Sequence, residues 1–298
     1  MMTERKNTMK ISSEIASIAP YAGGEARTVA LMAEAGFDAY DLSLFSMGRI
    51  DWSTGRVKRV GHPLEGEEAL AFVREIRRTA DACGIVCNQS HAPFPVSCPE
   101  IRSMLPRALE LTAEAGGKVC VIHPDNHLSA GENAKLFRQL LPTAKSLGVK
   151  IATENMWCWD SGEDHATFAA CATPADFLAH LDAIDDPDFV ACLDIGHAEM
   201  RGLGTSAPEM IRALGPRLAA LHVHDNDLRH DSHELPFSMQ IDFTAVTRAL
   251  REVGYAGDMT LEADTYFRHH ADTAPETLLS RMADTARRLA RMVLGEAE

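Results

Sequence analysis

The stretch ARTVALMAEAGFDAYDLS, residues 26–43, contains the repeating unit that determines the fold. Apolar side chains recur at helical spacing from Val29 to Ala35, and Gly36 stands where a helix would end. Residues 37–42 follow as the next predicted strand. The same order of helix, turn and strand recurs in ADACGIVCNQSH, AEAGGKVCVIHP, KSLGVKIATEN, DDPDFVACLDIGH, LGPRLAALHVHD and VGYAGDMTLEAD. The chain is therefore predicted to alternate helices and strands along its length.

Eight strands are expected when MKISSEIAS, which begins at Met9, is counted as the first. Their predicted ranges are 9–15, 38–43, 84–90, 118–123, 149–154, 189–194, 219–224 and 258–263. Alternation with helices implies parallel strands and right-handed crossovers, because a parallel pair needs a long return connection. Eight such units in 298 residues predict an α/β fold, a (β/α)8 TIM barrel, as a single domain spanning residues 1–298. The rival is a doubly wound open sheet, but its glycine-rich loop has only RGLGTSAPE as a candidate, after the sixth strand and without the third glycine.

Composition limits the classes of function. Asp and Glu outnumber Lys and Arg by 43 to 29, so the formal charge of −14 disfavours a broad electrostatic contact with nucleic acid. The N-terminal MMTERKNTMK lacks the apolar core of a signal peptide, and no segment approaches the roughly 18 apolar residues that span a bilayer. We therefore expect a cytoplasmic protein with no membrane partner. The seven cysteines include no CxxC pair, which argues against a disulfide framework and a zinc knuckle.

Polar side chains stand at the carboxyl ends of six successive predicted strands, where the active sites of (β/α)8 enzymes lie. They interrupt runs as apolar as VCVI and VACL, so burying them without partners would cost roughly several kcal/mol each. A shared divalent cation would satisfy them, and carboxylates mixed with imidazoles suit Mn²⁺, Mg²⁺, Co²⁺ or Zn²⁺. The candidates are Gln89, Ser90, His91, His123, Glu154, Asn155, Asp194, His197, His222, His224, Asp225, Glu262 and Asp264. Seven further histidines have no such placement and are expected at the surface or in loops, namely His62, His127, His165, His180, His230, His269 and His270.

Seven motifs follow one another from the third strand to the eighth, namely NQSHAPF, VIHP, ATEN, LDIGH, LHVHDND, DSHELPFSMQIDF and LEAD. In this order they resemble the xylose isomerase-like (β/α)8 superfamily, which includes sugar-phosphate isomerases and epimerases, ketose 3-epimerases, inosose dehydratase and metal-dependent apurinic endonucleases. The resemblance to the isomerase and epimerase branch implies one divalent ion bound by Glu154, Asp194, His222 and Glu262. Substrate contacts are expected from His91, His123, His197, His224, Asp231, His233 and Arg268, the last as a site for a phosphate. No organic cofactor is expected.

The two glutamates fit a proton-transfer reaction. Moving a carbonyl by one carbon, or inverting a neighbouring centre, requires a proton to leave a carbon of very low acidity. A Lewis acid that chelates the carbonyl and the neighbouring hydroxyl stabilises the enediolate, and a carboxylate on each face can remove and return the proton. Glu154 and Glu262 end separate strands and could flank a bound sugar. We therefore expect a metal-dependent isomerase or epimerase of a sugar, sugar phosphate or polyol, with these two residues as acid and base.

Two other classes of function remain open. The three-zinc ligand pattern of the apurinic endonucleases matches nine residues, which predicts further zinc ions and an endonuclease-IV-like phosphoesterase for abasic DNA. The acidic balance opposes this, and so does the N-terminal KISSEIASIAPYAGG, which differs from the glycine- and histidine-containing opening of those nucleases. A sugar-binding or metal-sensing barrel without catalysis would not need both glutamates. Barrels of this kind commonly pair, so a homodimer is an open option. The nine matching residues are His91, His123, Glu154, Asp194, His197, His222, Asp231, His233 and Glu262.

Overall fold

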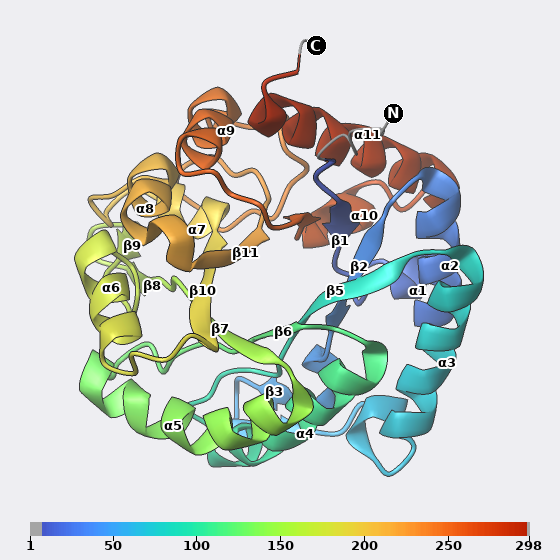
Figure 1. The fold of residues 1–298 in the computed structure, drawn as a ribbon, viewed down its shortest axis with the longest axis horizontal. Coiled ribbons are helices and arrows are strands. Elements are labelled where there is room, and N and C mark those ends of the chain that lie inside the picture. Colours follow the sequence, from blue (N-terminus) through green and yellow to red (C-terminus); the bar gives the residue numbers. More distant parts are fainter. Residues whose placement is uncertain (1–7, 297–298) are drawn as a thin grey trace, which may run out of the picture.

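The computed structural model describes residues 8–296, which form a ring of eight parallel strands surrounded by helices (Figure 1). The predicted TIM barrel is confirmed, and each predicted strand range contains an observed strand or overlaps one. Residues 1–7, which hold most of the N-terminal stretch considered for a signal peptide, lie outside the described range. The barrel strands are β1 (Ile11–Ser13), β2 (Ala39–Ser43), β5 (Val86–His91), β6 (Val119–Val121), β7 (Lys150–Glu154), β10 (Phe189–Asp194), β11 (Leu218–His222) and β12 (Met259–Leu261).

The strand register brings the carboxyl ends to one rim of the ring. Six strands pair in the order β11-β10-β7-β6-β5-β2, and β1 pairs with β12. Two isolated bridges close the ring, since Glu14 pairs with Asp41 and Val223 with Leu261. Within the larger sheet Asp194 lies opposite His222. Residues at successive strand ends are therefore neighbours across the rim.

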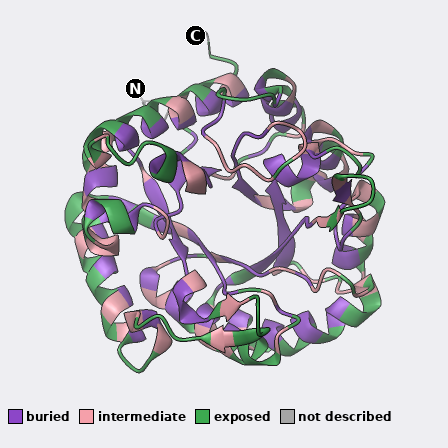
Figure 2. Ribbon diagram, turned by 180° about the vertical axis from the view of Figure 1, so that it is seen from behind, coloured by how far each residue is buried: buried purple, intermediate pink, exposed green. Residues whose placement is uncertain are grey.

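Amphipathic helices cover the outside of the barrel, with their buried faces turned inward (Figure 2). In α3, Val73, Ile76 and Ala80 recur at spacings of three and four residues and are buried, as a helix facing the sheet requires. Gly36 ends α2 with a φ of 94°, the left-handed conformation that glycine adopts without strain. The helices are α1 (Ala19–Ala22), α2 (Glu25–Ala35), α3 (Ala69–Cys83), α4 (Pro99–Ala115), α5 (Ala130–Leu147), α6 (Pro174–Asp182), α7 (Ile195–Glu199), α8 (Ala207–Leu214), α9 (Phe243–Glu252), α10 (Asp264–His269) and α11 (Pro275–Leu294).

Two short hairpins lie at the rim of the barrel and were not predicted from the sequence. The loop after β2 folds into the antiparallel pair β3 (Arg49–Asp51) and β4 (Arg56–Lys58). The loop after β7 contains β8 (Cys158–Asp160) and β9 (His165–Thr167). Each strand has three residues, too few for an alternating apolar pattern to be recognised. Short 3₁₀ turns complete the elements as η1 (Phe45–Met47), η2 (Pro63–Glu65) and η3 (Gly215–Arg217).

His180 corrects one expectation from the sequence, because it is buried on α6 and does not lie at the surface or in a loop. It shares the inward face of this helix with Phe177 and Leu181. Its Nδ1 lies 2.9 Å from the carbonyl oxygen of Asp176, and its Nε2 lies 3.2 Å from the side-chain nitrogen of Asn133. These partners offset the cost of removing the imidazole from water.

Within residues 8–296, no helix is long and apolar enough to cross a membrane.

Candidate metal centre

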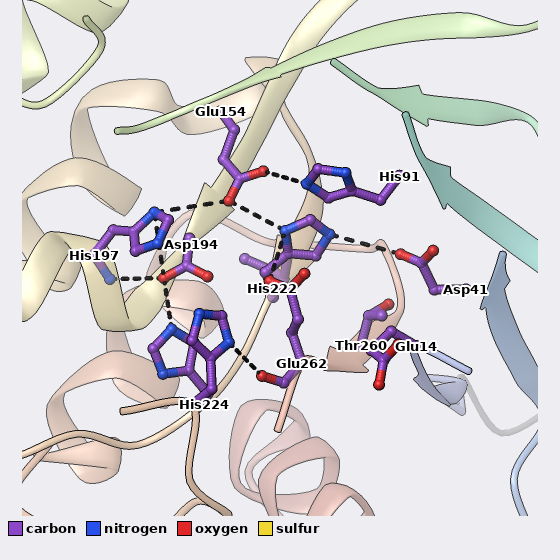
Figure 3. A network of polar contacts seen from close by, with 12 residues as sticks. Glu14, Asp41, His91, Glu154, Asp194, His197, His222, His224, Thr260 and Glu262 are labelled. Atoms are coloured by element: carbon purple, nitrogen blue, oxygen red, sulfur yellow. Dashed lines mark hydrogen bonds and ion pairs between the residues drawn. The ribbon is translucent and has the colours of Figure 1, made fainter. Parts of the chain in front are cut away.

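Four acidic and imidazole side chains from separate strands meet at the carboxyl rim of the barrel (Figure 3). Glu154 ends β7, Asp194 ends β10, His222 ends β11, and Glu262 follows β12 by one residue. The Nδ1 atom of His222 lies 3.2 Å from Glu154 Oε1 and 3.3 Å from Glu262 Oε2. One potential ligand atom from each of the four residues lies within 4.8 Å of the others. We call this group the central cluster.

The central cluster has polar atoms whose hydrogen-bonding capacity the protein does not use. All four side chains are at least 93% buried. Among the described residues, Glu154 Oε2, Asp194 Oδ2 and both ring nitrogens of His222 lack a hydrogen-bond partner. At this depth the three carboxylates would repel one another, and their oxygen atoms and the imidazole nitrogens would lack hydrogen bonds, unless a cation or protons neutralise the negative charge. The donor set of oxygen and nitrogen fits a divalent ion of the Mn²⁺, Mg²⁺, Co²⁺ or Zn²⁺ type.

Two further histidines extend the central cluster toward β5 and β6. Glu154 Oε2 lies 3.5 Å from His91 Nε2 and 3.4 Å from His123 Nε2. The two imidazole nitrogens are 2.9 Å apart. These three residues also form a group that could bind a metal. Glu154 therefore belongs to both groups and could bridge two ions.

A separate group lies beside α7 and the loop after β11, and we call it the loop cluster. It consists of His197, His224, Asp231 and His233, again with ligand atoms within 4.8 Å of one another. Asp231 Oδ2 lies 3.3 Å from His197 Nε2 and 3.1 Å from His233 Nε2. Asp231 Oδ1 lies 3.4 Å from His224 Nε2. The structure thus brings the imidazoles and Asp231, expected to contact substrate, into groups suited to metal binding.

Burial and nearby charge move the pKa values of two central carboxyl groups in opposite directions. Burial raises the pKa of Glu262 well above its usual value because it penalises the charged form, and Asp264 adds to this effect. Burial acts on Glu154 in the same sense, but His222 and His123 outweigh it and hold the pKa of that carboxyl well below its usual range. The two glutamates therefore differ in their affinity for a proton when no ion is bound.

Buried side chains behind the central cluster hold its members in place. Asp41 Oδ2 lies 3.6 Å from His222 Nε2, on the side of the ring away from Glu154 and Glu262. Gln89 donates a hydrogen bond of 2.9 Å to the same Asp41 oxygen. The carboxylate thus orients His222 so that Nδ1 faces the potential ligand atoms.

A cavity of 1090 Å³ opens onto this rim and is lined by both charged and aromatic side chains. Glu154 and Glu262 lie at its wall together with His91, His123, His197, Asp231 and His233. Arg268, expected from the sequence to bind a phosphate, is exposed on α10 and also lines the cavity. Asp194, His222 and His224 are buried behind these residues, with 1% exposure or less. Members of both clusters therefore reach the cavity from several strands and loops.

Some residues of the site could not be identified from the sequence. The hairpin β3–β4 places Arg49, Trp52 and Lys58 along the cavity. Asp41 interrupts the apolar strand β2, and that interruption was the available signal for its buried role. Glu14, at the end of β1, is also buried. Burial raises its pKa to about 8, and Asp264 contributes in the same direction.

The sequence profile of the xylose isomerase-like TIM barrel family matches residues 29–287. The chain belongs to this family. Its curated relatives include the uncharacterized protein MJ1311 of Methanocaldococcus jannaschii, 28% identical over 58% of this chain and 62% of that protein. Another is the uncharacterized protein y4fM of Sinorhizobium fredii, 37% identical over 25% of this chain and 24% of that protein. The chain thus spans less than two thirds of the length of these relatives.

Solved structures of the same fold include several sugar epimerases. A D-tagatose 3-epimerase-like protein superposes with a TM-score of 0.71 at 19% identity, covering 96% of this chain and 99% of that chain. A D-psicose 3-epimerase from Clostridium cellulolyticum has a TM-score of 0.69 at 17% identity, covering 97% and 100%. The 3-keto-D-glucoside 4-epimerase of E. coli has a TM-score of 0.65 at 16% identity, covering 92% and 98%. At these identities the similarity establishes the shared barrel fold.

Proposed function

We propose that the chain is a divalent-metal-dependent isomerase or epimerase of a sugar, sugar phosphate or polyol. The observation that carries the proposal is the placement of Glu154 and Glu262, two buried carboxyl groups of opposite pKa shift, around His222 at the wall of a 1090 Å³ cavity. A cavity of about this size suits a small molecule and its hydration water. The epimerases of the same fold support the assignment to sugar chemistry.

The central cluster supplies both a binding site and an acid and base pair. Glu154, Asp194, His222 and Glu262 would hold the divalent ion, which acts when bound as a Lewis acid on a carbonyl and its neighbouring hydroxyl. Glu154, which its lowered pKa keeps ionised, would accept a proton from the carbon beside the carbonyl, and Glu262 would return one on the opposite face. In the reverse direction the two residues exchange these roles.

The cavity wall can position a polyhydroxylated substrate. His91 and His123 lie on one side of Glu154, and the aromatic rings of Phe94 and Trp157 also line the cavity. Aromatic rings exclude water and pack against the apolar faces of sugars. Arg268 and Lys58 supply positive charge at the same cavity, where a substrate phosphate would be bound.

The proposal is tested by turnover and by hydrogen exchange from solvent. Protein reloaded with Mn²⁺, Mg²⁺, Co²⁺ or Zn²⁺ is incubated with ketoses, aldoses and their phosphates in D₂O. We expect isomerisation or epimerisation with deuterium incorporated at the carbon that loses its proton. Glu154→Gln and Glu262→Gln should each lower kcat by about 100-fold or more, whereas Glu163→Gln, at an exposed position on the β8–β9 turn, should not. Absence of exchange with every sugar and metal would refute the proposal.

A second candidate is an endonuclease-IV-like multinuclear zinc phosphoesterase acting on abasic DNA. The specific observation in its favour is that all nine matching residues fall in groups of side chains whose potential ligand atoms lie within 4.8 Å of one another, and that Glu154 is shared between groups. The formal charge of −14 opposes binding to a DNA backbone. Incubation of the zinc-loaded protein with an abasic duplex at low salt separates the two candidates, because strand cleavage without any sugar exchange would favour the phosphoesterase.

A further inference from the structure

Five polar side chains form a hydrogen-bonded network across the interior of the barrel, behind the central cluster. We call this the interior network, and it consists of Ser12, Asn88, Thr260, Gln89 and Asp41. The interior of such a barrel is usually filled by branched apolar side chains. Here all members except Asn88 are at most 3% exposed. The strand register places Ser12 opposite Thr260 and Asp41 opposite Gln89, so the network joins the pair β1–β12 to the pair β2–β5.

A bulge in β5 brings two neighbouring side chains into the interior network. Asp41 pairs with Gln89, but the residue before Asp41 pairs with the residue before Asn88, so Asn88 is an extra residue in β5. Successive residues of a regular strand point to opposite faces, whereas a bulge changes the direction of a side chain. Asn88 and Gln89 can therefore both bond to the hydroxyl of Thr260, at 2.9 and 3.4 Å.

The direction of each hydrogen bond in the interior network follows from Asp41. The side-chain nitrogen of Gln89 faces two groups that only accept, Asp41 Oδ2 at 2.9 Å and a backbone carbonyl oxygen at 3.5 Å. This turns Gln89 Oε1 toward Thr260, whose hydroxyl must donate to it. The Thr260 oxygen then accepts from the side-chain nitrogen of Asn88. The side-chain oxygen of Asn88 accepts in turn from Ser12 at 2.8 Å. Every donor therefore points along the network toward Asp41.

The orientation of Asp41 depends on this network. Among the described residues, Asp41 Oδ1 has no hydrogen-bond partner, so the bond from Gln89 to Oδ2 fixes the rotation of the carboxylate. The same Oδ2 lies 3.6 Å from His222 Nε2, on the opposite side of the ring from Glu154 (Figure 3). Hydrogen bonds in series polarise one another in a protein interior. Removing the donor at Thr260 should therefore change the contact between Asp41 and the imidazole.

We propose that Thr260 is a positioning residue for the metal ligand His222. Thr260 is fully buried and is not among the described residues that line the cavity, so it acts without touching substrate. Its hydroxyl determines which way the amide of Gln89 faces, and that amide holds Asp41 against the imidazole. Without the hydroxyl, Gln89 Oε1 is buried without a donor, and a reversed amide would place this oxygen against the carboxylate. The inference rests on the proposed binding of a divalent ion by the central cluster.

A double-mutant cycle tests whether Thr260 acts through Asp41. Protein stripped with a chelator is titrated with Mn²⁺ in competition with a chelating dye. Thr260→Val removes the hydroxyl and should weaken ion binding by about 3- to 10-fold, whereas Thr260→Ser keeps the donor and should bind as the wild type does. Added to Asp41→Asn, Thr260→Val should change the affinity by less than about twofold. Thr247→Val is the matched control, because it removes a buried hydroxyl on α9 that donates to Phe243.

A structural role alone would give a different pattern in the same cycle. The Thr260→Val substitution would then weaken ion binding equally in the wild type and in Asp41→Asn. That result, or failure of Thr260→Ser to bind as the wild type does, would overturn the inference.

The imidazole of His222 gives a second readout that needs neither ion nor turnover. In stripped protein labelled with ¹⁵N-histidine, the Nε2–H resonance of His222 is assigned by its absence in His222→Ala. We expect this resonance to move in Thr260→Val and to keep its position in Thr260→Ser. An unmoved resonance in Thr260→Val would exclude the positioning role. If the wild type binds no divalent ion while the resonance moves as expected, the proposed function fails and the role of Thr260 in orienting His222 stands.

Discussion

Asp41 is placed to control the orientation of His222, and this predicts an effect on metal affinity. Its carboxylate lies 3.6 Å from His222 Nε2 and is held by Gln89. Loss of the negative charge in Asp41→Asn should weaken binding of the divalent ion at the central cluster by about 10- to 100-fold, the usual range for such supporting residues. Competition with a chelating dye measures the affinity. Asp284→Asn, at an exposed position on α11, should bind the ion as the wild type does.

Glu14 should make the protein less stable as the pH rises into the alkaline range. Burial raises its pKa from the usual value of 4.5 to about 8, so the folded state favours the protonated form. The stabilisation is complete below about pH 4.5 and is lost as the pH rises through about 8. Glu14→Gln stays neutral and should therefore lose less free energy of unfolding than the wild type between pH 5 and pH 9, by up to a few kcal/mol.

Urea unfolding of metal-stripped protein at these two pH values measures the difference. Glu75→Gln, an exposed change on α3, provides the matched control and should follow the wild type. Parallel pH curves for Glu14→Gln and the wild type would show that Glu14 titrates as an ordinary carboxyl. The serines around it satisfy either protonation state, since Ser43 donates its hydroxyl to Glu14 Oε2 at 3.0 Å.

A substitution in the hairpin β3–β4 should weaken substrate binding without lowering the stability of the protein. Trp52, at its turn, is 75% exposed and still lines the cavity. Trp52→Ala removes an aromatic contact worth roughly 1 kcal/mol, so the KM of the sugar substrate should rise about 3- to 10-fold with little change in kcat. Steady-state kinetics and a thermal melt measure both quantities. Phe168→Ala is the control, because Phe168 is 58% exposed but is not among the described residues that line the cavity. An unchanged KM in Trp52→Ala would contradict a role for Trp52 at the cavity.

The elements differ in how far the sequence could predict them, and local periodicity explains the difference. The strand β10 was predicted with its observed bounds, because FVACLD is a continuous apolar run ended by a carboxylate. The hairpins β3–β4 and β8–β9 have no such run, and their pairing depends on contacts at the rim. The candidate ligands could be predicted because they follow strand ends. Their division into a central and a loop cluster could not, since it depends on the path of residues 225–240.

The whole barrel is closed at two places where few backbone contacts join the strands. At one of them Val223 pairs with Leu261 through an isolated bridge, and His222 and Glu262 stand on either side of it. An ion bound by these two residues would connect β11 to β12 across the seam. One hydrophobic cluster contains residues from Met9 to Val293 and so joins the first barrel strand to the last helix. The ion should therefore stabilise the entire ring as one unit.

Removing the metal should consequently lower the stability of the whole molecule and loosen this seam first. At an ion concentration of about 1,000 times Kd the expected stabilisation is roughly 4 kcal/mol, or about 6 °C in Tm for a chain of this size. When the ion is bound, hydrogen exchange should be slower at two backbone amides of the seam. The amide of Val223 donates to the carbonyl oxygen of Thr260, and that of Glu262 to the carbonyl oxygen of Val223, at 3.0 Å each. Calorimetry and exchange mass spectrometry, with and without chelator, measure both effects. His222→Ala should lose most of the shift in Tm, and a wild-type Tm that does not respond to the ion would show that the central cluster is neutralised by protons instead of a metal.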